Sequence, residues 1–144
     1  AAAFQAKGYT VLAVDGAKAM CDLTAARGIP TQQATFQSFT APEKSFQLIW
    51  AMASLLHVPW ADMPALLEKY VTMLEVDGVF YMSFKELEAE GEDSKGRYFN
   101  APSMADIAKL LQSDPRVGLI DIWQTQDAGN RDFIWWNLVL RRKS

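Results

Sequence analysis

An aspartate at the end of an apolar strand is the residue of this sequence with the clearest chemical use. Residues 9–15 read Tyr-Thr-Val-Leu-Ala-Val-Asp, a β-branched and aliphatic run without polar alternation. Such a run is typical of a parallel strand covered on both faces. Ligands of open α/β sheets bind beyond the carboxyl ends of the strands, where a carboxylate can accept hydrogen bonds from a ribose diol. Asp15 is therefore the first candidate binding residue.

A histidine follows a second apolar strand, which we predict over residues 46–50. This residue, His57, is the only histidine of the sequence. Because imidazole changes its protonation near neutral pH, a histidine just beyond the carboxyl end of a strand is the best candidate for a general base or a substrate-orienting group. A histidine that caps or packs beside Pro59 and Trp60 is an equally good interpretation.

Three further side chains are candidates for contact with a ligand. Arg97 and Tyr98 lie in the run Gly-Arg-Tyr-Phe-Asn at residues 96–100, which is typical of a lid and equally of a packing anchor. Lys85 ends a third predicted strand and ranks after them. The acidic side chains of residues 86–93 favour a solvated loop over a metal site. One histidine and one cysteine argue against a zinc site, and the absence of a Gly-x-Ser-x-Gly elbow argues against a serine hydrolase.

The elements that position these residues alternate between helix and strand. The predicted helices cover residues 1–7, 18–27, 62–74 and 103–114. The predicted strands between them cover residues 10–14, 31–35, 46–50 and 79–84. Gly8 and Gly28 are in the position that ends a helix, and Ser103 with Asp106 resembles a capping box. Repeated strand–helix units predict a parallel α/β sheet with right-handed crossovers.

Two local predictions concern the ends of these elements, and a third concerns the end of the chain. Asp62 is placed to cap the third helix, and residues 76–78 (Val-Asp-Gly) are typical of a turn before the following strand. Residues 117–125 and 133–141 are strand-like. The connection over residues 126–131 is too short for a helical crossover, so we predict that these two strands pair antiparallel.

Composition limits the class of protein. A length of 144 residues fits one domain, and 50% hydrophobic with 22% charged residues is an ordinary globular composition. A net charge of −3 argues against a nucleic-acid partner. Cys21 is the only cysteine, is predicted to be a buried thiol and cannot form an internal disulfide, while no apolar run has the length of a membrane span. We therefore expect no membrane partner and a cytoplasmic location.

The chain resembles a class I S-adenosylmethionine-dependent methyltransferase. Four features carry this resemblance: the repeated parallel units, the acidic residue that ends one strand, the turn of small residues after the strand over residues 46–50, and the closing hairpin. Residues 46–59, 83–85 and 96–99 resemble the small bacterial methyltransferases of the type 11 or tellurite-resistance-like group. The resemblance covers nearly the whole chain. It implies a three-layer Rossmann-like α/β sheet, mostly parallel with a C-terminal antiparallel hairpin, with S-adenosylmethionine as cofactor and a small molecule as methyl acceptor.

The resemblance also assigns roles to individual residues. The cofactor-binding residues that it implies are Asp15, Gly16, Met20, Thr35, Phe36, Ala51 and Met52. Asp15 would bind the ribose hydroxyls, and Gly16 with Met20 would line the adenosine. Thr35 and Phe36 would flank the adenine, while Ala51 and Met52 would face the methionine part through their backbone. Many relatives have an acidic residue at the position of Thr35. His57 would act as base or orient the acceptor, which Arg97, Tyr98 and Lys85 would bind.

The sequence departs from the family at its start. It lacks the Gly-rich turn between the first strand and the first helix, and it begins within the helix that should follow that turn. We therefore expect one domain over residues 1–144 that misses its first, central strand. Two apolar strand edges would then lack a partner. The chain is expected to be a part of a longer protein, inactive or impaired as it stands, or to form a strand-exchanged or edge-paired homodimer.

Two other functions remain open at this point. An NAD-binding Rossmann oxidoreductase would also use Asp15 to hold the adenine ribose, and it too should have a Gly-rich fingerprint. A non-catalytic scaffold fragment would keep the sheet and lose the cofactor. The closing hairpin and residues 50–59 favour the methyltransferase.

Overall fold

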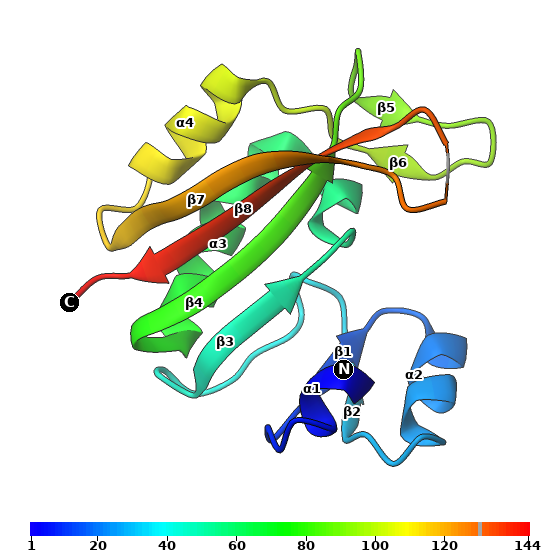
Figure 1. Ribbon diagram of the computed structural model, residues 1–144, viewed down its shortest axis with the longest axis vertical. Helices are drawn as coiled ribbons and strands as arrows, with labels where there is room; N and C mark the ends of the chain where they lie inside the picture. The colour runs from blue at the N-terminus through cyan, green and yellow to red at the C-terminus, as the bar shows by residue number, and fades with distance from the viewer. Residues whose placement is uncertain (130) are drawn as a thin grey trace. The chain divides into compact units, whose positions relative to one another are not determined.

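The chain forms two compact units, Ala1–Thr40 and Ala41–Ser144, in a computed structural model that describes residues 1–129 and 131–144 (Figure 1). The first unit contains α1 (Ala2–Gln5), β1 (Ala13–Asp15), α2 (Lys18–Ala25) and β2 (Thr31–Gln33). The second contains all remaining elements. The connection predicted over residues 126–131 includes Asn130, which lies outside the described residues.

In the first unit, β1 and β2 pair in parallel, and α2 forms the crossover between them. Gly8 and Gly28 follow the two helices with φ values of +87° and +75°, which confirms both predicted helix ends. Cys21 on α2 is buried, as predicted, and its Sγ donates to the carbonyl oxygen of Asp15 at 3.3 Å. This contact ties the crossover helix to the end of β1.

The prediction of a long strand over residues 9–15, covered on both faces, is wrong. Only residues 13–15 have strand geometry, and the side chains before and within them are exposed: Tyr9 is 62%, Leu12 41% and Val14 38% exposed. The reason is pairing. Within the described residues β1 has a single strand partner, β2, so no second ladder extends it or shields its other edge.

The second unit is built on a four-stranded sheet in the order β3-β4-β8-β7. The strands are β3 (Phe46–Ala51), β4 (Leu74–Lys85), β7 (Val117–Gln126) and β8 (Ile134–Arg142). β3 is parallel to β4, and β8 is antiparallel to both β4 and β7. The predicted C-terminal antiparallel hairpin is confirmed, and the sheet is mixed, because only one of its three strand pairs is parallel.

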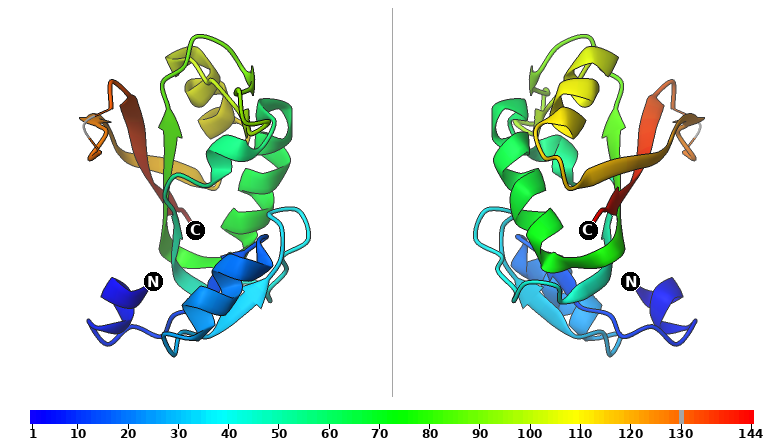
Figure 2. Two further views of the ribbon diagram at one scale, coloured as in Figure 1. Left: turned by 90° about the vertical axis from the view of Figure 1, so that its right-hand side faces the viewer. Right: turned by 90° about the vertical axis from the view of Figure 1, so that its left-hand side faces the viewer.

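Helices α3 (Met63–Met73) and α4 (Met104–Gln112) lie on one face of this sheet (Figure 2). The side chains of Phe80, Met82 and Phe84, which alternate along β4, are at most 1% exposed on that face. The apolar side chains of α3 are buried against them, with the Tyr70 ring 6.0 Å from that of Phe80. Burial of each large apolar side chain stabilises the fold by about 1.5–3 kcal/mol.

Of the predictions for element ends, one is wrong, one is confirmed in part and one is confirmed in full. The turn predicted over residues 76–78 is instead a bulge inside β4, where Asp77 has φ +64° and the register with β3 shifts. Asp62 occupies the N-cap position of α3 as predicted, but its side chain makes no capping hydrogen bond, and a short 3-10 helix, η2 (Trp60–Asp62), leads directly into α3. The capping box of Ser103 and Asp106 on α4 is present in full.

Three more short elements lie near the carboxyl ends of β3 and β4. They are the 3-10 helix η1 (Leu55–His57) and the two-residue strands β5 (Gly91–Glu92) and β6 (Tyr98–Phe99). β5 and β6 pair antiparallel and form a hairpin over the segment that the sequence predicted as a loop or lid. The candidate residues of the second unit are carried by these elements.

An arginine at the end of β8 closes the carboxyl end of α3. Arg142 Nη1 donates to the carbonyl oxygens of Val71 (3.1 Å), Thr72 (3.0 Å) and Leu74, groups that a helix end leaves without partners. We expect Arg142→Met to lower the free energy of unfolding by about 1.5–3 kcal/mol, the value of hydrogen bonds to a charged group. Urea denaturation measures this loss.

The neighbouring Arg141→Met is the matched control. The side chain of Arg141 is exposed and donates to no described residue, so we expect its replacement to change the free energy of unfolding by less than about 0.5 kcal/mol. Equal losses in the two variants would show that Arg142 does not hold the helix end.

Candidate functional site

In the first unit, Asp15 ends β1 and shapes the turn into α2. Its Oδ1 accepts a hydrogen bond from the backbone N–H of Ala17 at 2.8 Å, while no described residue donates to Oδ2. Gly16 follows, and a Cβ added there would meet only the carbonyl oxygen of Ala34 at 3.9 Å. Met20, in the first turn of α2, is 50% exposed. The turn therefore presents one unengaged carboxylate oxygen beside open backbone.

Thr35 and Phe36 follow β2, which ends beside β1. The backbone N–H of Ala34 donates to the carbonyl oxygen of Asp15 at 3.0 Å, so the two strand ends lie together. The hydroxyl of Thr35 accepts from the backbone N–H of Ser38 at 3.1 Å and is engaged in a local turn. Phe36 is half-buried. The first unit thus gathers all five of its sequence-predicted residues around the carboxyl ends of β1 and β2.

In the second unit, Ala51 and Met52 end β3 at a sharp turn. Ala51 is buried, and Met52 is 58% exposed. Ala53 has φ +49°, a left-handed conformation that a residue with a side chain rarely adopts. The hydroxyl of Ser83, buried on β4, accepts the backbone N–H of Ala53 at 2.8 Å and holds the turn. No role was predicted for Ser83, because its partner is 30 positions away.

His57 on η1 contacts the β5–β6 hairpin. Its Nδ1 lies 2.7 Å from the carbonyl oxygen of Tyr98, and its ring is 4.7 Å from that of Phe99. A carbonyl oxygen only accepts, so this contact assigns the proton of the neutral ring to Nδ1 and leaves Nε2 with its lone pair. The ring of Phe99 is also 5.4 Å from Lys85 Nζ and 5.3 Å from Arg97 Cζ. Phe99 therefore gathers three predicted residues that lie far apart in sequence.

Tyr98 and Arg97 are both held by carboxylates. The hydroxyl of Tyr98 donates to Glu90, whose Oε1 also accepts the backbone N–H of Trp60 at 2.9 Å. This hydrogen bond, with burial and the negative charge of Glu90 adding to it, raises the pKa of Tyr98 to about 12. Arg97 donates from Nε and Nη2 to Asp93 at 2.9 and 2.6 Å, and these contacts lower the pKa of Asp93 to about 2.

Asn100 joins the hairpin to η1 and was not singled out from the sequence. It is fully buried, and its Nδ2 donates to the carbonyl oxygens of Leu55 (3.0 Å) and Val58 (2.9 Å). Its backbone N–H donates to Leu56 at 2.8 Å. These bonds fix the 3-10 turn that carries His57. A single polar residue after an aromatic pair is the only signal in the sequence, and it does not identify partners about 40 positions away.

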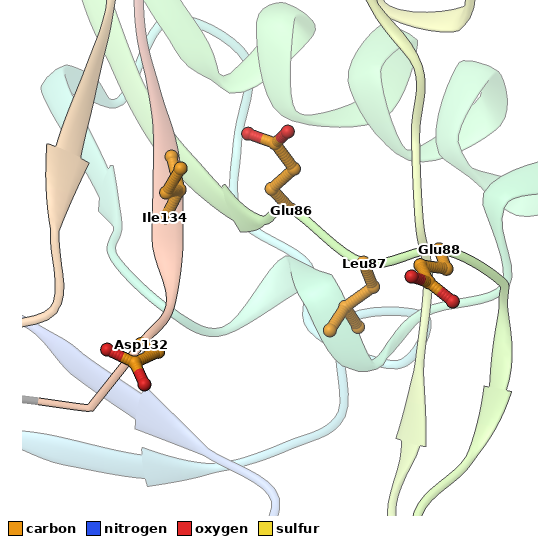
Figure 3. A pocket seen from close by; sticks show the side chains of 5 residues that line it. All are labelled: Glu86, Leu87, Glu88, Asp132 and Ile134. Atoms are coloured by element: carbon orange, nitrogen blue, oxygen red, sulfur yellow. The ribbon is translucent and has the colours of Figure 1, made fainter.

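A hollow of about 420 Å³ opens at the ends of β4 and β8. Figure 3 shows the side chains that line it, which are Glu86, Leu87, Glu88, Asp132 and Ile134. The carboxylates of Glu86 and Glu88 come from the segment after β4, and that of Asp132 from the segment before β8. Within the described residues no group of three or more histidine, cysteine or acidic side chains has the geometry to hold a metal ion.

None of the described helices combines the length and apolar character that a membrane crossing requires.

The comparisons with known proteins identify the family. A profile described as "Methyltransferase domain" matches residues 1–78, more than half of the chain. The chain therefore belongs to this family, the class I S-adenosylmethionine-dependent methyltransferases. The family resemblance inferred from sequence is confirmed, and with it S-adenosylmethionine as the family's cofactor. No curated protein matches the chain.

Solved structures share the fold at low sequence identity. A methyltransferase from Methanosarcina mazei superposes with a TM-score of 0.81 at 13% identity, over 99% of this chain and 86% of that one. The 1,6-didemethyltoxoflavin-N1-methyltransferase of Burkholderia thailandensis, bound to 1,6-didemethyltoxoflavin and S-adenosylhomocysteine, gives 0.80 at 18% identity. That match covers 99% of this chain and 65% of the other. A methyltransferase from Mesorhizobium loti gives 0.73 at 17% identity, over 92% and 80% of the two chains.

The contacts of Asn100 lead to a pH-dependent prediction. Asn100→Asp keeps the shape of the side chain but replaces Nδ2, which donates to the carbonyl oxygens of Leu55 and Val58, with a carboxylate oxygen. Burial beside acceptors favours the protonated acid, so its pKa in the folded protein is raised above the unfolded value. We expect the variant to lose about 2 kcal/mol or more at pH 8 and to recover part of it as the pH falls towards 5.

Urea denaturation at the two pH values measures this difference, with Ser94→Ala in the exposed turn of the hairpin as the control. If Asn100→Asp loses the same free energy of unfolding at both pH values, the Asn100 side chain stabilises the fold by packing and not by its hydrogen bonds to the carbonyl groups.

Proposed function

We propose that this protein transfers a methyl group from S-adenosylmethionine to a small-molecule acceptor. The family match over residues 1–78 carries the proposal. The fit of the cofactor is supported by the turn after β1, where Asp15 has an unengaged Oδ2 and the adjoining Gly16 has open space around its Cα. When bound, S-adenosylmethionine supplies a methyl group already activated on a sulfonium, so the protein has to bind, orient and exclude water.

The residues of the first unit bind the nucleoside in this proposal. Asp15 accepts hydrogen bonds from the ribose hydroxyls, and Gly16 with Met20 lines the adenosine. Thr35 and Phe36 flank the adenine. Because the hydroxyl of Thr35 is engaged with Ser38, its contribution comes from backbone and methyl group, while the Phe36 ring supplies the apolar surface.

The residues of the second unit handle the methionine part and the acceptor. Ala51 and Met52 contact the methionine part through backbone groups. His57 acts as the base, because its Nδ1–H donates to Tyr98 and its Nε2 keeps a lone pair. Lys85 binds the acceptor beside Phe99, and Arg97 and Tyr98, which are held by Asp93 and Glu90, line the acceptor site and position it. A base is needed only where the acceptor must lose a proton early in the transfer.

The domain of residues 1–144 lacks one strand of the family sheet in our proposal, and its activity is impaired without it. Two observations support this. The edge of β1 opposite β2 and the edge of β3 opposite β4 each lack a strand partner within the described residues. Apolar side chains are exposed on both strands, including Val14 and Leu48 at 38% each. A strand from a longer form of the chain, or from a second copy, would satisfy these backbone groups.

Cofactor binding tests the proposed function. We expect isothermal titration calorimetry to show saturable binding of S-adenosylhomocysteine and no binding of NAD. Asp15→Asn should weaken the former by about 10- to 100-fold, because it removes charge-assisted hydrogen bonds of about 1.5–3 kcal/mol. Asp22→Asn, an exposed aspartate paired with Lys18 on α2, is the control and should leave the affinity unchanged.

Two outcomes contradict the proposal. If NAD binds and depends on Asp15, the chain works as a dinucleotide-binding domain. If neither ligand binds, the chain as it stands is a scaffold without cofactor.

The open edges predict self-association. We expect sedimentation experiments at about 100 μM to show species larger than the 16.1 kDa monomer, because unpaired apolar edges recruit further strands. Leu48→Lys places a charge on the edge strand β3 and should shift the protein towards monomer. Val76→Lys changes a side chain that is 45% exposed in the bulge of β4 and serves as control. A chain that stays monomeric at this concentration would count against unpaired edges.

A further inference from the structure

Lys85 is a cation without a polar partner. It is the last residue of β4, and its side chain is half-buried. Its Nζ lies 3.2 Å from the centroid of the Phe133 ring and 5.4 Å from that of Phe99. Its ammonium group forms no hydrogen bond and no ion pair with any residue of the described part of the chain. The ammonium therefore sits between two aromatic rings with its hydrogen-bond donors unused.

The two neighbouring arginines are already neutralised. Arg97 binds Asp93, and Arg131 binds Asp127 at 2.9 Å from Nε and 3.0 Å from Nη2. Asp127 is 5% exposed and also accepts from Trp135 Nε1 at 3.0 Å, so this pair is built firmly into the fold. Of these three cationic side chains, only Lys85 has no carboxylate partner among the described residues.

The surroundings of Lys85 disfavour its charged form. Burial lowers the pKa of Lys85, the positive charges of Arg131 and Arg97 lower it further, and the carboxylates of Asp127 and Asp93 oppose this only in part. An anion placed against Nζ would offset both burial and repulsion. The site favours a ligand with a single negative charge, because one ammonium group is unpaired, both guanidinium groups are occupied and the carboxylates of the adjoining hollow repel a polyanion.

We propose that Lys85, between Phe99 and Phe133, binds the carboxylate of the methyl acceptor, and that the acceptor is a small monocarboxylate with an apolar, planar body. This inference rests on the proposed function, since it names the acceptor class of the same site. The carboxylate takes the unused ammonium donors, and the two rings pack against the apolar body. In this inference His57, whose ring also contacts that of Phe99, faces the part of the acceptor that is methylated.

Benzoate is the probe that tests this inference, with benzamide as its uncharged analogue. Ligand-observed NMR titrations use the full chain with S-adenosylhomocysteine present. We expect benzoate to bind at least tenfold more tightly than benzamide, and Lys85→Gln to abolish that preference. Lys95→Gln, an exposed lysine in the turn of the β5–β6 hairpin, is the matched control and should bind benzoate unchanged. Benzoate affinity should fall as the pH rises towards the pKa of Lys85, where the ammonium loses its proton.

The outcomes separate this inference from the proposed function, because S-adenosylhomocysteine binding is measured on the same samples. Lys85-dependent binding of benzoate without binding of S-adenosylhomocysteine would support the anion site and contradict the methyltransferase function of this chain. Equal binding of benzoate and benzamide, no binding of benzoate, or benzoate binding that survives Lys85→Gln would overturn the inference. Binding of S-adenosylhomocysteine by Lys85→Gln confirms that the variant is folded.

Discussion

The backbone pairing of β4 is the constraint on which the second unit depends. β4 is bonded on one edge to β3 and on the other to β8, so its position fixes both neighbours. The side chains of β4 alternate between two faces of the sheet, and the two sets have different roles. Phe80, Met82 and Phe84 form the core on one face, whereas Ser83 holds the turn after β3 and Lys85 ends the strand among aromatic rings. One strand therefore couples the stability of the core to the geometry of the candidate site.

Features that depend on residues close together in sequence could be predicted. The glycines that end the first two helices, the capping box on α4 and the antiparallel pairing of the last two strands each follow from a few neighbouring residues. The start of β4 could not be predicted in this way. Asp77 and Gly78 are typical of a turn, but pairing with Phe46 of β3 extends the strand back to Leu74 and leaves those residues in a bulge. Long-range pairing overrides a local turn signal.

The sequence predicted which residues belong to the candidate site, but it did not predict which side chains they contact in the folded protein. Arg97 was preferred over Lys85 as a ligand-binding cation, and a guanidinium can bind an anion through two parallel donors. In the folded protein that fork is occupied by Asp93, four positions earlier, while Lys85 forms no ion pair with any described carboxylate. Charge alone does not reveal which cation remains available. Asn100 was not predicted for the same reason, because its role depends on two carbonyl groups, of Leu55 and Val58, that are distant in sequence.

The turn after β3 shows how the fold stabilises a conformation that its own sequence disfavours. Ala53 is in the left-handed region, at a cost of about 1–2 kcal/mol for a residue that is not glycine. The hydrogen bond to buried Ser83 offsets part of that cost. Glycine would remove the strain but would also give the turn many alternative conformations. If the methionine part of the cofactor is bound through this backbone, as we propose, strained alanine held by serine provides a turn that is ordered before the cofactor arrives.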